Sequence, residues 1–191
     1  VGHVWLVQGD TTVYTAAPDT RSASTRDARA VWLTKTLLQW PRVTAMGTVK
    51  LYHSATGQVQ APLDGVVTGS DGSVTLEAFA GSVPADAATR FKWLDAGAVY
   101  AVKAADQASL PTLLKSQLVL VQEDASGKVQ NATTTQLPGL LDDLYASAND
   151  VADLGVSISA GSTRFKLWAP TAQKVYVFNY DTPTGSATTV D

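Results

Sequence analysis

The sequence predicts a mostly β protein made of immunoglobulin-like β-sandwich domains, the last of them incomplete within the 191 residues. Three observations lead to this prediction. Apolar and polar residues alternate with a period of two in many short runs, which is typical of half-buried strands. Gly, Asp, Ser and Pro separate these runs, as they do at turns between strands. Near the C-terminus, strand-like runs carry more apolar surface than the remaining residues could cover.

The first 27 residues divide into two predicted parts. Residues 1–16 hold two short β-like runs within VWLVQGDTTVY, which are too few strands to form a domain. Residues 17–27 are small, polar and aperiodic, which is typical of a linker. We therefore expect the closing strands of one module at 1–16, a linker at 17–27, and a new domain after it.

A complete β-sandwich is predicted for residues 28–146. ARAVWL and KTLLQW are typical of adjacent strands, and Pro41 ends the second. GTVKLYHS alternates, and the turn Asp71-Gly72 precedes another strand. LVLVQED is apolar enough for a buried strand, and KVQNATTTQ follows it after a turn.

The stretch between these strands is ambiguous in sequence. Within residues 85–116, AGAVYAVKAADQ fits either a strand or a helix. LPTLLKSQ favours one short helix, because Ser109 and Pro111 are residue types that open helices.

Residues 147–191 are predicted to form the first strands of a further sandwich. A hairpin joins 154–159 to 163–169, and QKVYVFNY follows as the third strand of a β-meander. The final stretch, DTPTGSATTVD, is small and polar, which favours an exposed loop tip. Because the third strand is largely apolar on both faces, we expect another polypeptide or segment to supply the missing strands.

Composition argues against several classes of function. With 14 basic and 17 acidic residues the net charge is −3, so no basic patch indicates nucleic acid or an anionic membrane as a partner. No apolar run is long enough to span a bilayer. There is no Cys, which removes disulfides and thiol chemistry, and only two His residues, so no metal site is expected.

No catalytic constellation is recognisable. The only glutamates, Glu77 and Glu123, lie in strand-like runs and are expected to face solvent. His53-Ser54 pairs a base with a hydroxyl, but sequence neighbours seldom have the geometry of a triad. The five Trp residues lie in or near predicted strands, where a Trp more often packs in a core than stacks on sugar.

Several motifs resemble one enzyme family. LPGLLDDLYA, followed by LWAPTAQKVYVF, resembles the junction in pullulanase-type α-1,6-glucosidases, starch-debranching members of glycoside hydrolase family 13. There, an N-terminal β-domain passes into a family 48 carbohydrate-binding-like sandwich. ARAVWLTKTLLQWP with VKLYHS resembles the start of that N-terminal domain. VWLVQGDTTVY resembles the closing strands of a family 41 starch-binding module.

The resemblance implies a parent enzyme that hydrolyses α-1,6 linkages in pullulan, starch or glycogen-derived glucans by using two carboxyl groups. In the family those groups lie in a (β/α)₈ barrel, so this chain would be a non-catalytic support with the catalytic barrel and the rest of the family 48 sandwich as its partners. A secreted, extracellular bacterial protein is implied. No cofactor is expected in this chain, whereas the family allows calcium in the parent.

The resemblance also implies roles for individual residues. It implies that Trp5 binds carbohydrate. It implies structural contacts to the catalytic domain for one further set of residues: Asp142, Asp143, Tyr145, Trp168 and Pro170.

Two other functions stay open. A free-standing carbohydrate-binding or adhesion module without an enzyme would respond to ligand through Trp fluorescence. An autonomous hydrolase would require activity that depends on Glu77 or Glu123.

Overall fold

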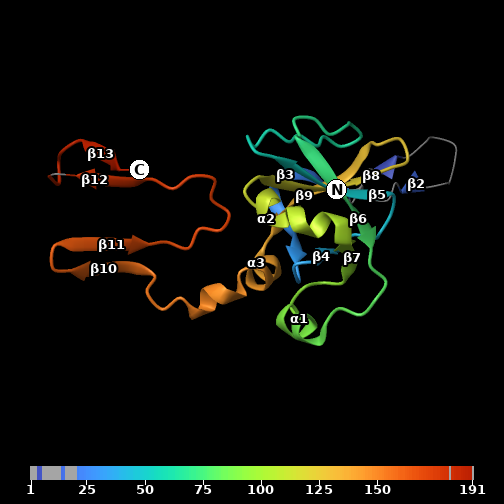
Figure 1. Cartoon of the computed structure of the whole chain (residues 1–191). Coiled ribbons are helices and arrows are strands. Elements are labelled where there is room, and N and C mark those ends of the chain that lie inside the picture. The colour runs from blue at the N-terminus through green and yellow to red at the C-terminus, as the bar shows by residue number, and fades with distance from the viewer. Residues whose placement is uncertain (1–3, 6–13, 16–20, 181, 191) are drawn as a thin grey trace.

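The computed structural model describes residues 4–5, 14–15, 21–180 and 182–190. Most of the predicted module at 1–16 therefore lies outside the described residues. Within it, β1 (Val4–Trp5) pairs antiparallel with β2 (Tyr14–Thr15). The rest of the described chain consists of a β-barrel and a C-terminal extension, which we define as residues 151–190 (Figure 1).

Seven strands form one closed barrel in the order β3-β4-β7-β6-β5-β8-β9. Their bounds are β3 (Ala23–Trp32), β4 (Leu37–Pro41), β5 (Thr48–Ser54), β6 (Gly72–Ala78), β7 (Gly97–Val102), β8 (Gln117–Glu123) and β9 (Val129–Gln136). The helical segments are α1 (Ala85–Arg90), η1 (Ala104–Ser109), α2 (Leu110–Leu113), α3 (Pro138–Leu144) and η2 (Ala146–Asp150). The prediction of a mostly β fold is confirmed.

The barrel replaces the immunoglobulin-like sandwich that the sequence predicts for 28–146. The sheet closes because β3 pairs antiparallel with β4 on one side and parallel with β9 on the other. Strand β3 begins at Ala23, within the stretch 17–27 that the sequence predicts as a linker. Local alternation cannot reveal a pairing between the first and last strands of a domain, and closure removes the two open edges of the sheet.

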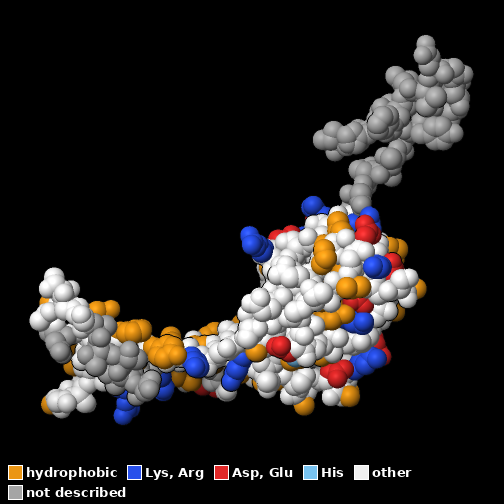
Figure 2. Space-filling view, turned by 90° about the horizontal axis from the view of Figure 1, so that it is seen from above, with side chains coloured by type: hydrophobic (Ala, Val, Ile, Leu, Met, Phe, Trp, Pro, Cys, Tyr) orange, Lys and Arg blue, Asp and Glu red, His pale blue; other side chains and the backbone are white. Residues whose placement is uncertain are grey.

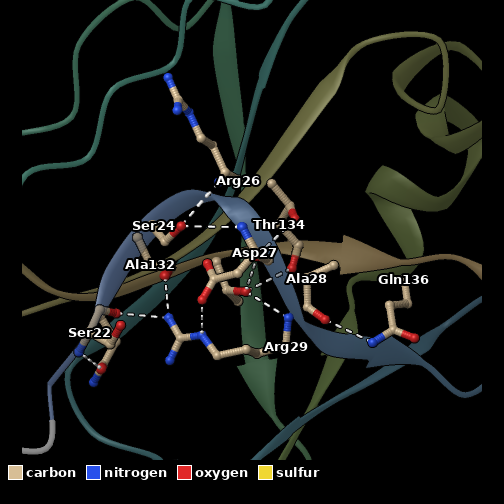
Figure 3. A network of polar contacts seen from close by, with 11 residues as sticks. Ser22, Ser24, Arg26, Asp27, Ala28, Arg29, Ala132, Thr134 and Gln136 are labelled. Atoms are coloured by element: carbon tan, nitrogen blue, oxygen red, sulfur yellow. Dashed lines mark hydrogen bonds and ion pairs between the residues drawn. The ribbon is translucent and has the colours of Figure 1, made fainter.

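Polar contacts hold the irregular part of β3 against β9 (Figure 3). The register shifts twice between Ala23 and Ala30, where regular ladder bonds are interrupted. Arg29 fills this gap: its guanidinium donates to the carbonyls of Ser22 (2.9 Å) and Ala132 (2.5 Å) and pairs with Asp27 (3.1 Å). Within the bulged segment, the Thr133 hydroxyl accepts from the backbone N–H of Arg29 and donates to the carbonyl of Asp27, so side chains bind backbone groups where the regular ladder is interrupted.

The barrel interior is filled by apolar side chains. Trp32 and Trp40 are fully buried there, as expected for core Trp residues, beside Leu38, Leu51 and Leu120. The prediction that LVLVQED is a buried strand is confirmed by β8. Its outer residues Val119 and Val121 are covered by Val59 and Ala61 of the segment after β5.

Two separate hairpins occupy the C-terminal extension. The predicted hairpin is confirmed, because β10 (Gly155–Ser159) pairs antiparallel with β11 (Ser162–Lys166). The predicted meander is wrong, because β12 (Val177–Tyr180) pairs with β13 (Ala187–Val190) and not with β11. The stretch predicted as a loop tip thus supplies a strand. No helix among the described residues is long and apolar enough to cross a membrane.

Candidate interface between the barrel and the C-terminal extension

Helix α3 connects the barrel to the extension and packs tightly on the barrel. Gly139 lies against the backbone of β3, since a Cβ built on it would stand 2.2 Å from the carbonyl oxygen of Leu33. Leu140 is fully buried in the barrel core. Only a residue without a Cβ allows two backbones to approach so closely. The sequence LPGLLDDL therefore fixes where the chain leaves the barrel.

The two adjacent aspartates of α3 make contacts to different parts of this same domain. Asp142 forms an ion pair with Arg90 at the end of α1. Asp143 accepts a 2.8 Å hydrogen bond from the backbone N–H of Lys35, in the turn between β3 and β4. Both carboxylates thus hold α3 against the barrel domain. Their predicted contact with a catalytic domain stays a prediction.

A pocket of about 270 Å³ lies between α3 and the start of the extension. Asp142 and Tyr145 line it from the helix side, and Leu154 and Trp168 line it from the extension. The Tyr145 and Trp168 rings meet edge to face, with centroids 6.5 Å apart and planes at 83°. This is a favourable aromatic geometry. Three of the five residues expected in a structural contact therefore come together here, while Asp143 points to the barrel and Pro170 is half-buried beyond Trp168.

Gln173 provides a second attachment of the extension. Its side-chain amide donates two hydrogen bonds of 2.8 Å, one to the carbonyl of Ala55 after β5 and one to that of Lys115 after α2. No sequence pattern indicates this role, because a Gln in a polar turn is an ordinary surface residue. WAPTAQ thus contacts the barrel side at both of its ends, through Trp168 and Gln173.

Replacing Gln173 by alanine should loosen residues 168–175 from the barrel without unfolding it, while the contact between Tyr145 and Trp168 remains. We expect the loss of two exposed hydrogen bonds to change the free energy of unfolding by only about 1 kcal/mol. Backbone amides in 168–175 should exchange with solvent distinctly faster in hydrogen exchange measured by mass spectrometry. Gln60→Ala, at an exposed position, is the matched control. Unchanged exchange in 168–175 would contradict the tethering role.

The hairpin β10–β11 is apolar on one face and polar on the other. The register places Val156 opposite Phe165, and Ile158 lies on the same face. Ile158 is 81% exposed and Phe165 is 62% exposed. The other face carries Ser157 and its cross-strand partner Arg164. Such a hairpin resembles half of a two-layer β-structure whose second layer covers the apolar face.

The hairpin β12–β13 also exposes large apolar side chains. Tyr176 and Phe178 share a face, with ring centroids 6.4 Å apart, and Val177 is on the opposite side. All three are roughly half exposed. Figure 2 shows hydrophobic side chains gathered along the extension where it leaves the barrel. Strand β12 is therefore solvated on both faces.

Glu123 corrects one expectation from the sequence. It is buried rather than solvent-facing, and it accepts hydrogen bonds from the Lys50 ammonium (2.8 Å) and the Tyr52 hydroxyl (2.6 Å). The hydrogen bond to Glu123 raises the pKa of Lys50, and burial, followed by the same carboxylate, raises the pKa of Tyr52. The strand pattern missed this because the partners of Glu123, Lys50 and Tyr52, lie on β5, 73 and 71 residues earlier in the chain.

The other polar candidates do not form a reactive group. Glu77 is exposed, as expected, and lies 3.7 Å from Lys103. Ser54 is fully buried, and its hydroxyl accepts a hydrogen bond from the backbone N–H of Gln58. In the described part of the chain, no group of three or more His, Cys, Asp or Glu residues could hold a metal ion. The side chain of Trp5 lies outside the described residues, so its sugar binding stays a prediction.

The fold and this interface define a closed β-barrel domain to which the chain that follows is attached through Trp168 and Gln173. A family model described as the Pullulanase N2 domain matches residues 27–143, and the chain belongs to this family. The resemblance seen in the sequence motifs is thereby confirmed.

Individual relatives agree with this assignment. The chain is 31% identical over 179 residues to a pullulanase of Klebsiella pneumoniae, and 33% identical over 156 residues to the chloroplastic pullulanase 1 of Arabidopsis thaliana. These matches cover 93% and 82% of the chain but only 16% of each relative. The solved structure of PulA from Klebsiella oxytoca matches with a TM-score of 0.69 at 29% identity, over 96% of this chain and 17% of PulA.

Proposed function

We propose that the chain is the non-catalytic N-terminal part of a pullulanase-type enzyme that hydrolyses α-1,6-glucosidic linkages in pullulan, starch or glycogen-derived glucans. Its role is to support the catalytic domain of that enzyme. The family assignment supports the parent, and the small share of each relative that the chain spans is consistent with one domain among several. We further propose that the parent enzyme is a secreted bacterial protein. Any calcium ion that it binds would lie outside this chain.

The observation that carries the proposal is the one-sided hairpin β10–β11. Its apolar face, with Val156, Ile158 and Phe165, is solvated, whereas its other face is polar. A β-layer from the remaining enzyme would bury this face, and each large apolar side chain so buried contributes roughly 1.5–3 kcal/mol. Contacts of Tyr145 with Trp168 and of Gln173 with the barrel meanwhile attach the chain that follows the hairpin to the barrel domain. The barrel would then position the sandwich, and through it the catalytic domain.

Ile158→Asp tests this arrangement against Ser157→Asp. Both place one charge on β10, but on opposite faces of the hairpin. In the whole parent enzyme, we expect Ile158→Asp to lower the melting temperature and pullulan hydrolysis after mild heating, because a carboxylate would be buried in the sandwich. Ser157→Asp should behave as the unmodified enzyme does.

Two results would contradict the proposal. Equal behaviour of the two variants would mean that the apolar face of β10 remains in solvent. Pullulan hydrolysis by the 191-residue chain alone would contradict a non-catalytic role and favour an autonomous hydrolase. Native mass spectrometry of the 191-residue chain adds a further readout. If the rest of the enzyme is supplied as a separate polypeptide and binds through the hairpins, the complex should be lost in Ile158→Asp.

A further inference from the structure

The pocket between α3 and the extension is accessible and has room for one small ring-shaped molecule. Its volume is about 270 Å³, close to the lower end of the roughly 300–1,000 Å³ that small-molecule sites occupy. All seven residues that line it are at least partly exposed, so a ligand in solvent can reach their side chains. Small-molecule sites often lie where two parts of a protein meet, as α3 and the extension do here.

Two aromatic side chains form one part of the lining. The edge-to-face contact between Tyr145 and Trp168 uses at most one face of each ring. Trp168 is 45% exposed, so indole surface remains for a flat, partly apolar ligand. Trp32 and Trp40, by contrast, are fully buried in the barrel core. Trp168 is therefore a Trp that can stack on a ligand.

Three polar groups of the lining have hydrogen-bonding capacity to spare. The Tyr145 hydroxyl has no hydrogen-bond partner among the described residues and is accessible to solvent. The side-chain amide of Asn149, on η2, likewise has no partner in the described part of the chain and can both donate and accept. Arg90 engages one carboxylate oxygen of Asp142, which leaves the other oxygen as an acceptor. This ion pair also balances the charge of Asp142, so the pocket favours a neutral ligand over an ion.

A sugar ring matches this combination of groups. Its faces carry C–H groups that pack on an aromatic ring, and its edge carries hydroxyls that both donate and accept. A carboxylate and an amide side chain can each bind two neighbouring hydroxyls, because each has two polar atoms side by side. Leu141 and Leu154 add an apolar wall for the remaining C–H groups. A wholly apolar ligand would instead leave the hydroxyl, amide and carboxylate without partners.

We propose that this pocket binds one ring of a neutral saccharide, with Trp168 as the stacking surface and with Tyr145, Asn149 and Asp142 as hydrogen-bonding partners. The junction between α3 and the extension is then a binding site as well as an attachment. The choice of an α-linked glucose unit as the sugar rests on the proposed function, whereas the saccharide site rests on the lining of the pocket.

Titration of the 191-residue chain with maltotriose, followed by NMR of the indole N–H groups, tests the site. The Trp168 resonance is identified by its loss in Trp168→Phe. We expect maltotriose to shift this resonance and to leave that of Trp93 in place, because Trp93 is 63% exposed but does not line the pocket. Cellotriose serves as the β-linked comparison.

Two substitutions test the polar partners. Asn149→Ala and Tyr145→Phe should each weaken maltotriose binding about two- to tenfold, through the loss of one hydrogen bond between neutral groups. The Asn149 side chain makes no hydrogen bond or ion pair among the described residues, and Tyr145→Phe keeps the ring that meets Trp168. Both melting temperatures should therefore stay unchanged, which separates weaker binding from unfolding. The matched controls Asn179→Ala and Tyr176→Phe, at exposed positions outside the pocket, should bind as the unmodified chain does.

Two results would overturn the inference. One is a Trp168 resonance that neither sugar shifts, and the other is undiminished maltotriose binding by both Asn149→Ala and Tyr145→Phe. The pocket would then serve only the contact between α3 and the extension. The proposed function would survive either result, because it depends on the hairpin β10–β11 and not on this pocket. Equal binding of both sugars would support the site and count against the α-linked glucose unit.

Discussion

Gly139→Ala is expected to lower the free energy of unfolding by about 3 kcal/mol or more, since a Cβ there would overlap backbone that cannot move aside. The atoms it would meet are the carbonyl carbon and oxygen of Leu33, at 2.3 and 2.2 Å, and the carbonyl oxygen of Trp32, at 2.6 Å. To relieve the overlap, α3 must shift away from β3. The shift would also disturb the buried Leu140 and the hydrogen bond from Lys35 to Asp143. Urea unfolding followed by Trp fluorescence measures the loss.

Gly72→Ala is the matched control for this change. Its added Cβ would meet only the end of the His53 imidazole, 2.9 Å away, and a side chain can turn aside where a backbone cannot. We expect its effect to stay within about 1 kcal/mol. Similar stabilities for the two glycine variants would show that α3 does not require the close backbone contact at Gly139.

Lys50→Met is expected to destabilise the barrel by about 3 kcal/mol, because it leaves the buried carboxylate of Glu123 without its cation. The Glu123 side chain is 4% exposed, and Lys50 supplies its only ion pair among the described residues. The Tyr52 hydroxyl remains as a donor, but one neutral hydrogen bond does not replace the lost charge. Methionine keeps the aliphatic stem of lysine, so the change isolates the ammonium group.

Lys103→Met provides the comparison, since it breaks an exposed pair with Glu77 at 3.7 Å. Exposed pairs contribute about 0–1 kcal/mol, so this variant should unfold at nearly the original urea concentration. The double variant Lys50→Met with Glu123→Gln should recover much of the stability lost by Lys50→Met alone, because no unpaired charge stays buried. An equally unstable double variant would show that Lys50 acts through packing and not through its charge.

Individual strands and one short helix were predictable because their signals are local. The apolar run of β8 and the hairpin β10–β11 follow directly from residue patterns and turns. Helix α2 begins after Ser109, as the Ser and Pro signals indicate, although the Ser109 side chain makes no capping hydrogen bond. Such features depend on neighbours within a few residues, which a single sequence displays.

The features that were missed depend on long-range pairing. Barrel closure requires β3 to meet β9, the polar contacts of Glu123 require β5 to pair with β8, and the attachment by Gln173 requires two separate turns to converge. The predicted pairing of β12 with β11 is wrong for a different reason: the small, polar residues of DTPTGSATTVD favour a loop, whereas its last residues form β13, which pairs with β12. Within the candidate interface, α3 lies in the motif LPGLLDDLYA that the sequence singles out. The motif does not reveal that Asp142 and Asp143 bind residues of the barrel domain itself, because those residues are distant in sequence.

The closure of the barrel by its first and last strands also has a consequence for biosynthesis. Asp27 and Thr134 are joined by a hydrogen bond across 107 residues of sequence. The pairing of β3 with β9 can therefore form only after β9 has left the ribosome. At translation rates of about 5–20 residues per second this delay lasts on the order of 5–20 s, far longer than a hairpin needs to form. During that interval one side of β3 is an open template for incorrect pairing, and we expect the bulges in residues 23–29 to make such pairing with another chain less favourable.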